Sequence, residues 1–261
     1  MSTGGIFTIS KGTKVVLVIT FSVSVLAILF AVFYYRDLNS LEDPRTKKAR
    51  ELLALFDKES GRIIDFSSFS LLDSANAVFR SYPDYEFSFE TGVVYNNKCS
   101  ALLLAAIYDT TISSSEKSKM LDLSMSYCDS SITVYKNWIS EWESLTVDDI
   151  TEKIRPLINE KDNHFEGLNF KRIFDNRVKD LIIAQVETPR RLSVSLSNKG
   201  TIYRHKFLVD SALLCYQQAL TLWKDNRTAK SNLSVLMGGE PVKPTIIESL
   251  FPPDKNKKPP S

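Results

Sequence analysis

The sequence predicts an all-α protein with a single N-terminal transmembrane helix followed by a helical domain. One observation is the stretch at residues 15–35, which has no charged residue and lies between Lys14 and Arg36. A second is that neither β alternation nor an Asn-Gly hairpin signal extends over any length of the sequence. The third is a set of apolar residues spaced three and four apart, which places them on one helix face: Ile173, Phe174, Val178, Leu181, Ile182 and Val186.

The N-terminal apolar stretch is long enough to cross a membrane. As a helix, residues 15–35 span a hydrocarbon core of about 30 Å. A cleaved signal peptide is the main alternative, but its apolar region covers only about 7–15 residues and ends in small residues. This stretch ends in Phe33, Tyr34 and Tyr35, which are typical of a membrane interface. A wholly buried core helix would need a larger domain than the rest of the chain provides. We therefore expect a single-pass anchor.

The residues that flank this stretch bear on which side of the membrane the domain occupies. Lysine and arginine favour the cytoplasmic flank. They are more numerous on the carboxyl side, which has Arg36, Arg45, Lys47, Lys48 and Arg50 against Lys11 and Lys14 on the amino side. However, Asp37, Glu42 and Asp43 also crowd the carboxyl flank, whereas the tail at residues 1–14 contains no acid. We expect a cytoplasmic tail at 1–14 and a domain on the extracytoplasmic, periplasmic side of the inner membrane.

Composition describes an ordinary globular domain at residues 36–240, followed by a Pro/Lys-rich tail at 241–261. The chain of 261 residues is 43% hydrophobic and 25% charged, and its net charge of +2 argues against a nucleic-acid surface. Because lysines and arginines alternate with acids, we interpret the charges as a solvated helical surface.

Residues 193–226 carry a pattern of small and aromatic residues that is typical of two closely packed helices. Six of the eight positions of the pattern match by residue type, in the correct order and spacing, whereas Lys199 stands for the expected Leu and Lys224 for the expected Pro. The matching residues, which we expect to pack the repeat, are Leu196, Gly200, Tyr203, Ala212, Tyr216 and Ala219.

On these residues the segment resembles a tetratricopeptide repeat (TPR), the unit of an α-solenoid of helical hairpins that binds other proteins. The resemblance implies that the first helix of each pair lines a concave binding face. The N-terminal anchor makes the arrangement similar to bacterial anchored repeat proteins of the cell envelope, including flagellar-motor-associated scaffolds.

Further copies of the helical pair can be aligned with the clear repeat. At residues 92–137, Asn97 and Cys99 align with Asn198 and Gly200, and Cys128 aligns with Tyr216. This divergent copy has about thirteen extra residues near 110–119, where Ser113 and Glu116 have capping-box spacing. A third, weaker pair is expected at 45–56 and 69–80, and a capping helix at 227–237.

The segment between the two clear copies is expected to be helical without matching the repeat. We predict that Pro189 ends one helix and opens the next, because proline lacks the N–H that a helix interior needs. A charged helix at 148–163 is predicted to break near Pro156. Asp148 and Asp149 are interpreted as first-turn acids that stabilise its amino end.

The three cysteines, Cys99, Cys128 and Cys215, show no metal-ligand spacing. We interpret them as small buried thiols. The alternative is a bridge between Cys99 and Cys128, which would lie on facing helices of one pair and could be oxidised in an exported domain.

No motif for chemistry was found, so we expect a protein that is not an enzyme and binds no cofactor and no metal. The two histidines, His164 and His205, have no second ligand at metal-binding spacing. The sequence contains no P-loop, no G-x-G-x-x-G and no G-x-S-x-G.

The TPR resemblance indicates where a protein or peptide partner would bind. Asparagine recurs at one equivalent place in each first helix, and an amide there could hold a peptide backbone. The family's carboxylate clamp is not expected, because Thr228 and Asn232 replace its basic pair. The alternative is that Asn198 and Asn232 only satisfy neighbouring helices. The candidate partner-binding residues are Asn97, Asn198, Thr201, Arg204, His205 and Asn232.

The sequence also contains a short basic cluster, Pro189-Arg190-Arg191. It could meet an acidic partner or phosphate headgroups, although solvated charge at a helix start is the commoner explanation. The leading functional hypothesis is a membrane-tethered scaffold or adaptor that binds a protein partner. The alternative is a structural subunit that self-associates within a membrane-bound complex, with an accessory subunit of an enzyme complex as a remoter possibility.

Overall fold

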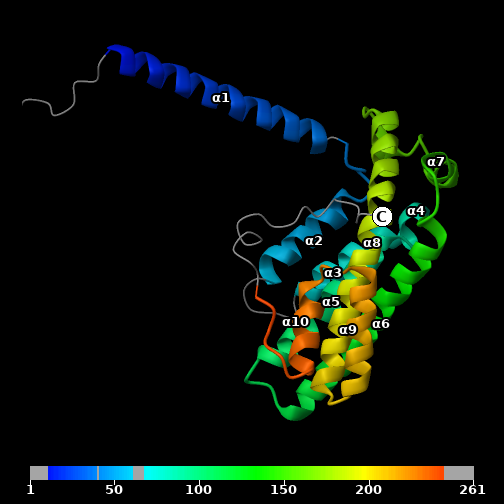
Figure 1. Ribbon diagram of the computed structural model, residues 1–261. Helices are drawn as coiled ribbons and strands as arrows, with labels where there is room; N and C mark the ends of the chain where they lie inside the picture. Colours follow the sequence, from blue (N-terminus) through cyan, green and yellow to red (C-terminus); the bar gives the residue numbers. More distant parts are fainter. Residues whose placement is uncertain (1–10, 40, 61–67, 244–261) are drawn as a thin grey trace, which may run out of the picture. The chain divides into compact units, whose positions relative to one another are not determined.

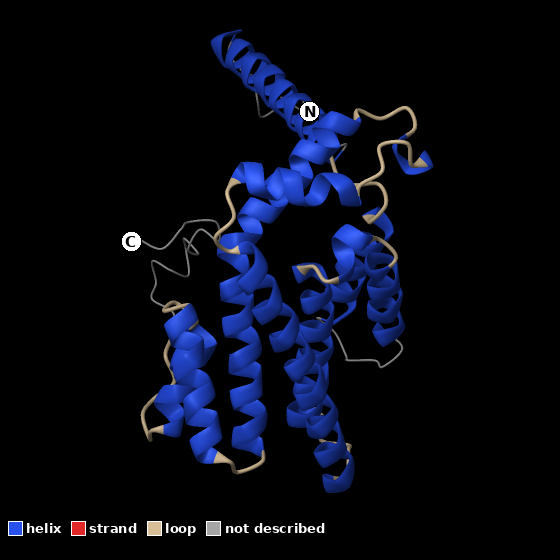
Figure 2. Cartoon of the chain, turned by 90° about the vertical axis from the view of Figure 1, so that its right-hand side faces the viewer, coloured by secondary structure: helices blue, strands red, loops and turns tan. Residues whose placement is uncertain are grey.

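The computed structural model describes residues 11–39, 41–60 and 68–243 of the chain. These residues form helices, turns and loops and no strand (Figure 2), which confirms the all-α prediction for the described part of the chain. Chain contacts divide the protein into two units, Met1–Glu42 and Asp43–Ser261. Most of the predicted tails, at 1–10 and 244–261, lies outside the described residues.

The first unit contains one long helix, α1 (Lys11–Asn39). Its window Gly12–Ala31 has a mean hydropathy of 2.5 and none of it is buried. At about 1.5 Å per residue, its 29 residues extend about 43 Å, which exceeds a bilayer core of about 30 Å. The helix is thus long and apolar enough to cross a membrane.

The second unit begins with a pair of short helices, α2 (Lys47–Ser60) and α3 (Phe69–Arg80), at the place predicted for the weakest pair. The two helices pack through Phe56, Leu72 and Phe79, which are buried. The single turn α4 (Pro83–Glu86) follows and buries Tyr85 in the same cluster.

The helices α5 (Phe89–Tyr108) and α6 (Ser114–Trp142) form the most extensive pair of the domain. The turn between them lies in the region predicted to hold extra residues. Ser113 Oγ accepts the Glu116 N–H, and the Glu116 carboxylate accepts the Ser113 N–H. These reciprocal bonds confirm the predicted capping box and explain why α6 begins there.

A short helix, α7 (Val147–Ile154), continues as a 3-10 turn, Arg155–Leu157, that contains Pro156. The break near this proline was predicted. Asp149 closes a capping box with Thr146, so its interpretation as a first-turn acid is confirmed. A second 3-10 turn, Asn163–Phe165, leads to the longest helix of the domain.

That helix, α8 (Phe170–His205), runs without interruption through Pro189, so the prediction that Pro189 ends one helix and opens another is wrong (Figure 1). A proline inside a helix costs about 3 kcal/mol. Packing on both sides outweighs that cost, because Leu181 and Ala184 before the proline and Leu192 after it are buried in the core. The clearest repeat therefore starts in the middle of a helix.

The last helices are α9 (Val209–Leu222) and α10 (Arg227–Leu236). Contacts place α9 against α8, and α10 against both α8 and α9. The predicted closing helix at 227–237 is thus present, although it ends one residue earlier. At the turn between α8 and α9, Phe207 has φ 61°, a conformation that strains a bulky side chain.

Candidate functional site

The close contact predicted within the clear repeat joins α8 to α9. Leu196, Ala212, Tyr216 and Ala219 are buried, and Tyr203 is half-buried. A Cβ atom on Gly200 would lie 2.7 Å from the Tyr216 ring, closer than real side chains approach. Only glycine therefore allows Tyr216 to pack flat against α8 at this place.

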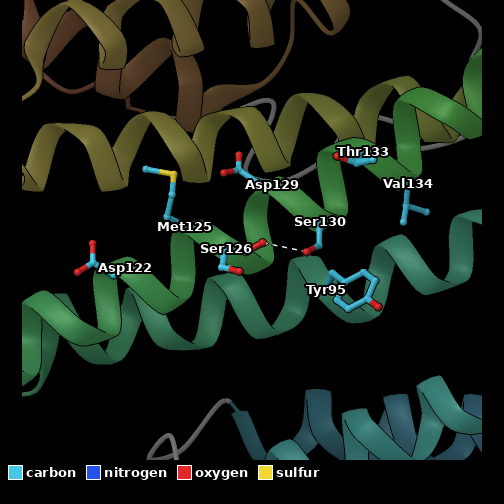
Figure 3. A pocket seen from close by; sticks show the side chains of 8 residues that line it. All are labelled: Tyr95, Asp122, Met125, Ser126, Asp129, Ser130, Thr133 and Val134. Atoms are coloured by element: carbon cyan, nitrogen blue, oxygen red, sulfur yellow. Dashed lines mark hydrogen bonds between the residues drawn. The ribbon is translucent and has the colours of Figure 1, made fainter.

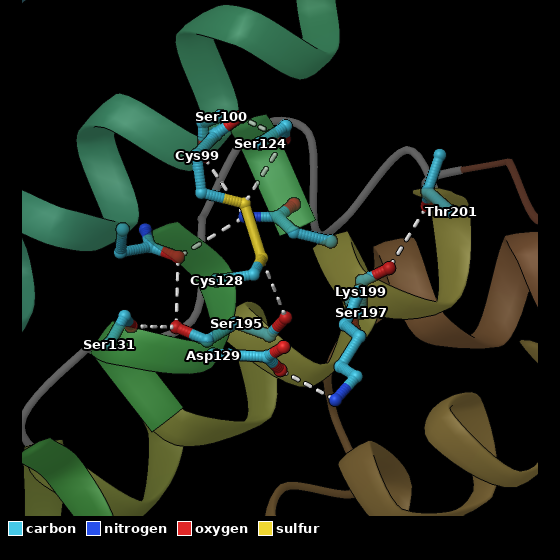
Figure 4. Close-up of a disulfide and its surroundings, with 12 residues drawn as sticks. Cys99, Ser100, Ser124, Cys128, Asp129, Ser131, Ser195, Ser197, Lys199 and Thr201 are labelled. Carbon is cyan, nitrogen blue, oxygen red and sulfur yellow. Dashed lines mark hydrogen bonds and ion pairs between the residues drawn. A yellow bond between two sulfur atoms is a disulfide. The ribbon is translucent and has the colours of Figure 1, made fainter. Parts of the chain in front are cut away.

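The equivalent contact in the preceding pair is a disulfide between Cys99 on α5 and Cys128 on α6 (Figure 4), with Cα atoms 5.3 Å apart. Cys99 is the residue that aligns with Gly200, and Cys128 aligns with Tyr216. The interpretation of these two cysteines as free thiols is therefore wrong, and the bridged alternative holds. Cys215 is free and buried.

A continuous set of hydrogen bonds, which we call the polar seam, joins the α5 and α6 pair to α8. Ser195 Oγ donates to Asn96 Oδ1 at 2.9 Å and lies 2.7 Å from Ser131 Oγ. Asn198 Nδ2 donates to Asn96 Oδ1 at 3.2 Å and to Ser100 Oγ at 2.9 Å. Small hydroxyls let the three helices approach while every one of these polar groups stays paired.

The polar seam continues from α8 to α10. Asn226, which caps α10, donates to Ser193 Oγ at 2.8 Å and to Ser197 Oγ at 2.9 Å. Further along, Asn232 Nδ2 donates to Thr201 Oγ1 at 3.1 Å. Sequence reasoning missed these serines, although the alternation of serine with buried Leu192 and Leu196 in this segment signalled small residues at a helix contact.

Three of the candidate partner-binding residues, Thr201, Arg204 and Asn232, are brought together, and they bind one another. Arg204 donates to Asn232 Oδ1 at 3.3 Å, so Arg204, Asn232 and Thr201 form one chain of hydrogen bonds. Thr201 is only 8% exposed, which corrects the expectation that it faces outward. Asn198 and Asn232 satisfy neighbouring helices, as the alternative interpretation stated. Asn97 and His205 remain half-exposed.

His205 lies at the end of α8 among positive charges. Its Nε2 is buried and has no hydrogen-bond partner among the described residues. Burial lowers the pKa of the imidazole, and the nearby cations Arg204 and Lys117 lower it further. A neutral ring is therefore favoured at pH 7, so the predicted basic surface is carried by Arg204 rather than by both residues.

Charged residues also form a buried network that sequence reasoning assigned to the solvated surface. Arg177 on α8 donates to Glu90 Oε1 at 2.6 Å, and both side chains are almost fully buried. Arg45 binds Asp43 at 2.6 Å and Asp84 at 2.8 Å. Spacing along the sequence could not reveal the pairs of Arg177 with Glu90 and of Arg45 with Asp84, because the partners lie 87 and 39 residues apart in the chain.

Each arginine of this network is held charged by its carboxylates. Burial lowers the pKa of Arg177, but the charges of Glu90, Tyr85 and Asp84 and the hydrogen bond to Glu90 together outweigh burial and leave that pKa raised. For Glu90, burial raises the pKa, and the charges of Arg177 and Arg50 together with hydrogen bonds from neighbouring side chains leave it lowered. Both members of this pair are thus held ionised in the folded protein.

An open groove of about 710 Å³ follows one face of α6, with Tyr95 contributed by α5 (Figure 3). Its two carboxylates are paired, Asp129 with Lys199 at 2.6 Å and Asp122 with Lys206. Ser130 Oγ donates to the Ser126 carbonyl. The two carboxylates are therefore ion-paired and do not contact the Ser130 hydroxyl as a base would. Within the described residues, no group of three or more His, Cys, Asp or Glu could hold a metal.

Comparison with known proteins adds no relative to this description. No protein family, curated protein or solved structure matches the chain.

Proposed function

We propose that the protein is a membrane-tethered module of TPR-like helical pairs that binds a protein partner. The observation that carries the proposal is the correspondence between the two pairs. Gly200 meets Tyr216 in one pair, and Cys99 meets Cys128 at the aligned positions of the other. Two pairs that share one close contact favour a repeated unit, and α10 covers the last pair as a terminal helix does in a solenoid.

The tether in this proposal is α1. Its apolar window would hold the domain at the membrane, where the local concentration of membrane-bound partners is raised, so that modest contacts suffice. By analogy of architecture alone, the protein would serve an assembly of the cell envelope.

The proposed location of the domain is extracytoplasmic. The disulfide supports this side, because such bonds persist in oxidising compartments and are rare in the cytosol. Fusions of a phosphatase and of a fluorescent protein to the carboxyl end would test it. We expect phosphatase activity and no fluorescence from an inner-membrane protein with an exported domain. The reverse pattern would place the domain in the cytoplasm.

The proposed partner surface includes the half-exposed residues Asn97, in the middle of α5, and Arg204 and His205, at the end of α8. A photo-crosslinking amino acid at each of these positions, one at a time, should yield the same crosslinked partner in cells. The control position is Gln217, which is exposed on α9. Crosslinks of equal strength from Gln217 would contradict this surface.

The alternative function is self-association within a larger complex. It is favoured by the turn after α8, where Phe207, Leu208 and Val209 are exposed in sequence and Phe207 is 89% exposed. Light scattering from the purified full chain separates the two functions. A monomer supports the adaptor, whereas an oligomer that Phe207→Ser dissociates supports the structural subunit.

A further inference from the structure

A cavity of about 290 Å³ lies between α2, α3, α5 and α8, apart from the surface proposed for a protein partner. Its walls combine apolar side chains with charged ones. The apolar residues come from all four helices: Leu53, Phe79, Phe89, Val93, Ile183 and Ala184. The charged residues are Arg50, Glu90, Asp180 and Arg191. A mostly apolar cavity with a few convergent polar groups is the usual form of a small-molecule site.

The charged residues that line this cavity are two arginines and two carboxylates, and one of the arginines has no ion-pair partner in the ranges that the structure describes. Asp180 is paired with Arg50 at 3.6 Å. Glu90 is paired with Arg177, which lies outside the cavity. Both carboxylates are therefore compensated, and Arg191 is left with no ion-pair partner among the described residues.

Arg191 packs against an aromatic ring, but one of its hydrogen-bond donors has no partner that the structure describes. Its guanidinium lies 4.8 Å from the centre of the Phe89 ring, so one face is covered by an aromatic side chain. Its NH1 atom is buried and has no hydrogen-bond partner within the described part of the chain. A buried donor without a partner costs about 1–3 kcal/mol, which an anion in the cavity would recover.

We propose that this cavity binds a small monocarboxylate with an apolar body. The carboxylate would accept hydrogen bonds from Arg191, whose fork of N–H groups matches two carboxylate oxygens. The apolar body would contact Phe79, Leu53 and Ile183. A carboxylate brings one negative charge, which would pair with Arg191, whereas a phosphate brings more charge and no apolar surface.

The test is calorimetric titration at pH 7 of the full chain in lipid nanodiscs, with empty nanodiscs as the blank. The probes are 4-methylpentanoate, the cation 3-methylbutylamine, which carries the same apolar group, and inorganic phosphate. We expect 4-methylpentanoate to bind at one site with a Kd on the order of 0.1–1 mM. The amine and phosphate should bind at least about tenfold more weakly, since each lacks one of the two features.

Two variants and a matched control locate the site. Arg191→Gln should weaken binding of 4-methylpentanoate about tenfold or more, because a charge-assisted contact is lost. Ile183→Trp should weaken it similarly by filling the cavity, and it tolerates change because Ile183 is 50% exposed. Arg190→Gln is the control: Arg190 pairs with Glu187 and does not line the cavity, so the Kd should change less than about twofold.

Circular dichroism establishes that each variant is folded. If Arg191→Gln does not fold, Ile183→Trp and the three probes still decide the outcome. Absence of saturable binding, equal binding of the amine, or an unchanged Kd in a folded Arg191→Gln or Ile183→Trp variant would overturn the proposal.

Discussion

Small residues at a few positions decide how closely the helices of this domain approach. Gly200 leaves room for the Tyr216 ring, and Gly92 does the same for Tyr135, whose ring lies 2.4 Å from the position of a Cβ on Gly92. Both tyrosines are fully buried. Each glycine thus removes a side chain from one helix so that an aromatic ring from the next can fill the space.

The close contact at Gly200 predicts that adding one methyl group at this position destabilises the fold. Gly200→Ala should lower the free energy of unfolding by about 1–2 kcal/mol, since overpacking typically costs 1–3 kcal/mol and alanine returns part of it through helix propensity. Urea denaturation followed by circular dichroism measures the change. In a Tyr216→Leu background the same substitution should be nearly neutral, and an equal cost there would exclude the ring as the cause.

The buried pair of Arg177 and Glu90 predicts a pH-dependent contribution. Glu90→Gln should cost about 3 kcal/mol at pH 7, because it leaves the Arg177 charge buried without its counter-ion. The folded-state pKa of Glu90 is lowered from 4.5, so its contribution is present above pH 4.5 and is lost as the pH falls further.

Urea denaturation of wild type and Glu90→Gln should therefore show a smaller difference in the free energy of unfolding at pH 3.5 than at pH 7. Burial raises the pKa of Asp84 and Asp180. Both groups are present in both proteins, so the pH dependence of the difference in unfolding free energy reports on Glu90. Glu152→Gln, at an exposed position on α7, should show no such trend. A difference that stays constant between the two pH values would contradict this account.

At the scale of single elements, local signals set where helices begin, and tertiary contacts set how far they extend. Ser113 and Asn226 cap α6 and α10 through their own side chains. By contrast, α8 continues past Pro189, and Gln185, one turn earlier, donates to the carbonyls of Trp142 and Leu145. These contacts tie the weakened part of α8 to the end of α6.

The cap on α6 predicts a moderate and local loss of stability. Ser113→Ala should lower the free energy of unfolding by about 1 kcal/mol, because the Glu116 N–H loses its acceptor. Ser115→Ala is the matched control, since Ser115 is exposed within the same helix and takes no part in the capping box. Thermal denaturation of both variants compares them, and equal losses would show that the cap has no special role.

These elements also show what could be inferred from sequence. Capping boxes, apolar periodicity and the aligned small residues are local patterns, so α1, the α5–α6 turn, α9 and α10 were placed correctly. Continuation through Pro189 depends on residues far away in the chain and was missed. The buried pairing of Arg177 with Glu90 and the cavity beside Arg191 were missed for the same reason, because each requires several helices at once.

At the scale of the whole molecule, one covalent link within a helical pair and several polar links between neighbouring helices hold the domain together. The disulfide closes a segment with a sequence separation of 29. The polar seam then joins this pair to α8, and α8 is shared with α9 and α10. Stability in such an arrangement depends on contacts between neighbouring helices, so a cross-link within one pair also supports the next.

Reduction of the disulfide should therefore weaken the whole domain. By loop-closure entropy, the bond between Cys99 and Cys128 contributes about 3–4 kcal/mol. Urea denaturation of the full chain in detergent, with and without dithiothreitol, measures this loss. The double variant Cys99→Ser, Cys128→Ser should not respond to the reductant, whereas Cys215→Ala should respond like wild type. An equal midpoint for oxidised and reduced wild type would rule out a stabilising bond.

Asn226 links the start of α10 to α8, so the order in which the chain is synthesised matters for this contact. Its side-chain Nδ2 donates to Ser193 Oγ and Ser197 Oγ, and its side-chain Oδ1 accepts the Ala229 N–H in the first turn of α10. The residue that caps α10 is therefore itself held by α8, and α10 can pack against α8 only once residue 226 and the residues after it have been synthesised. A polypeptide that ends before residue 226 lacks this side chain, so Ser193 and Ser197 lose the donor that they share.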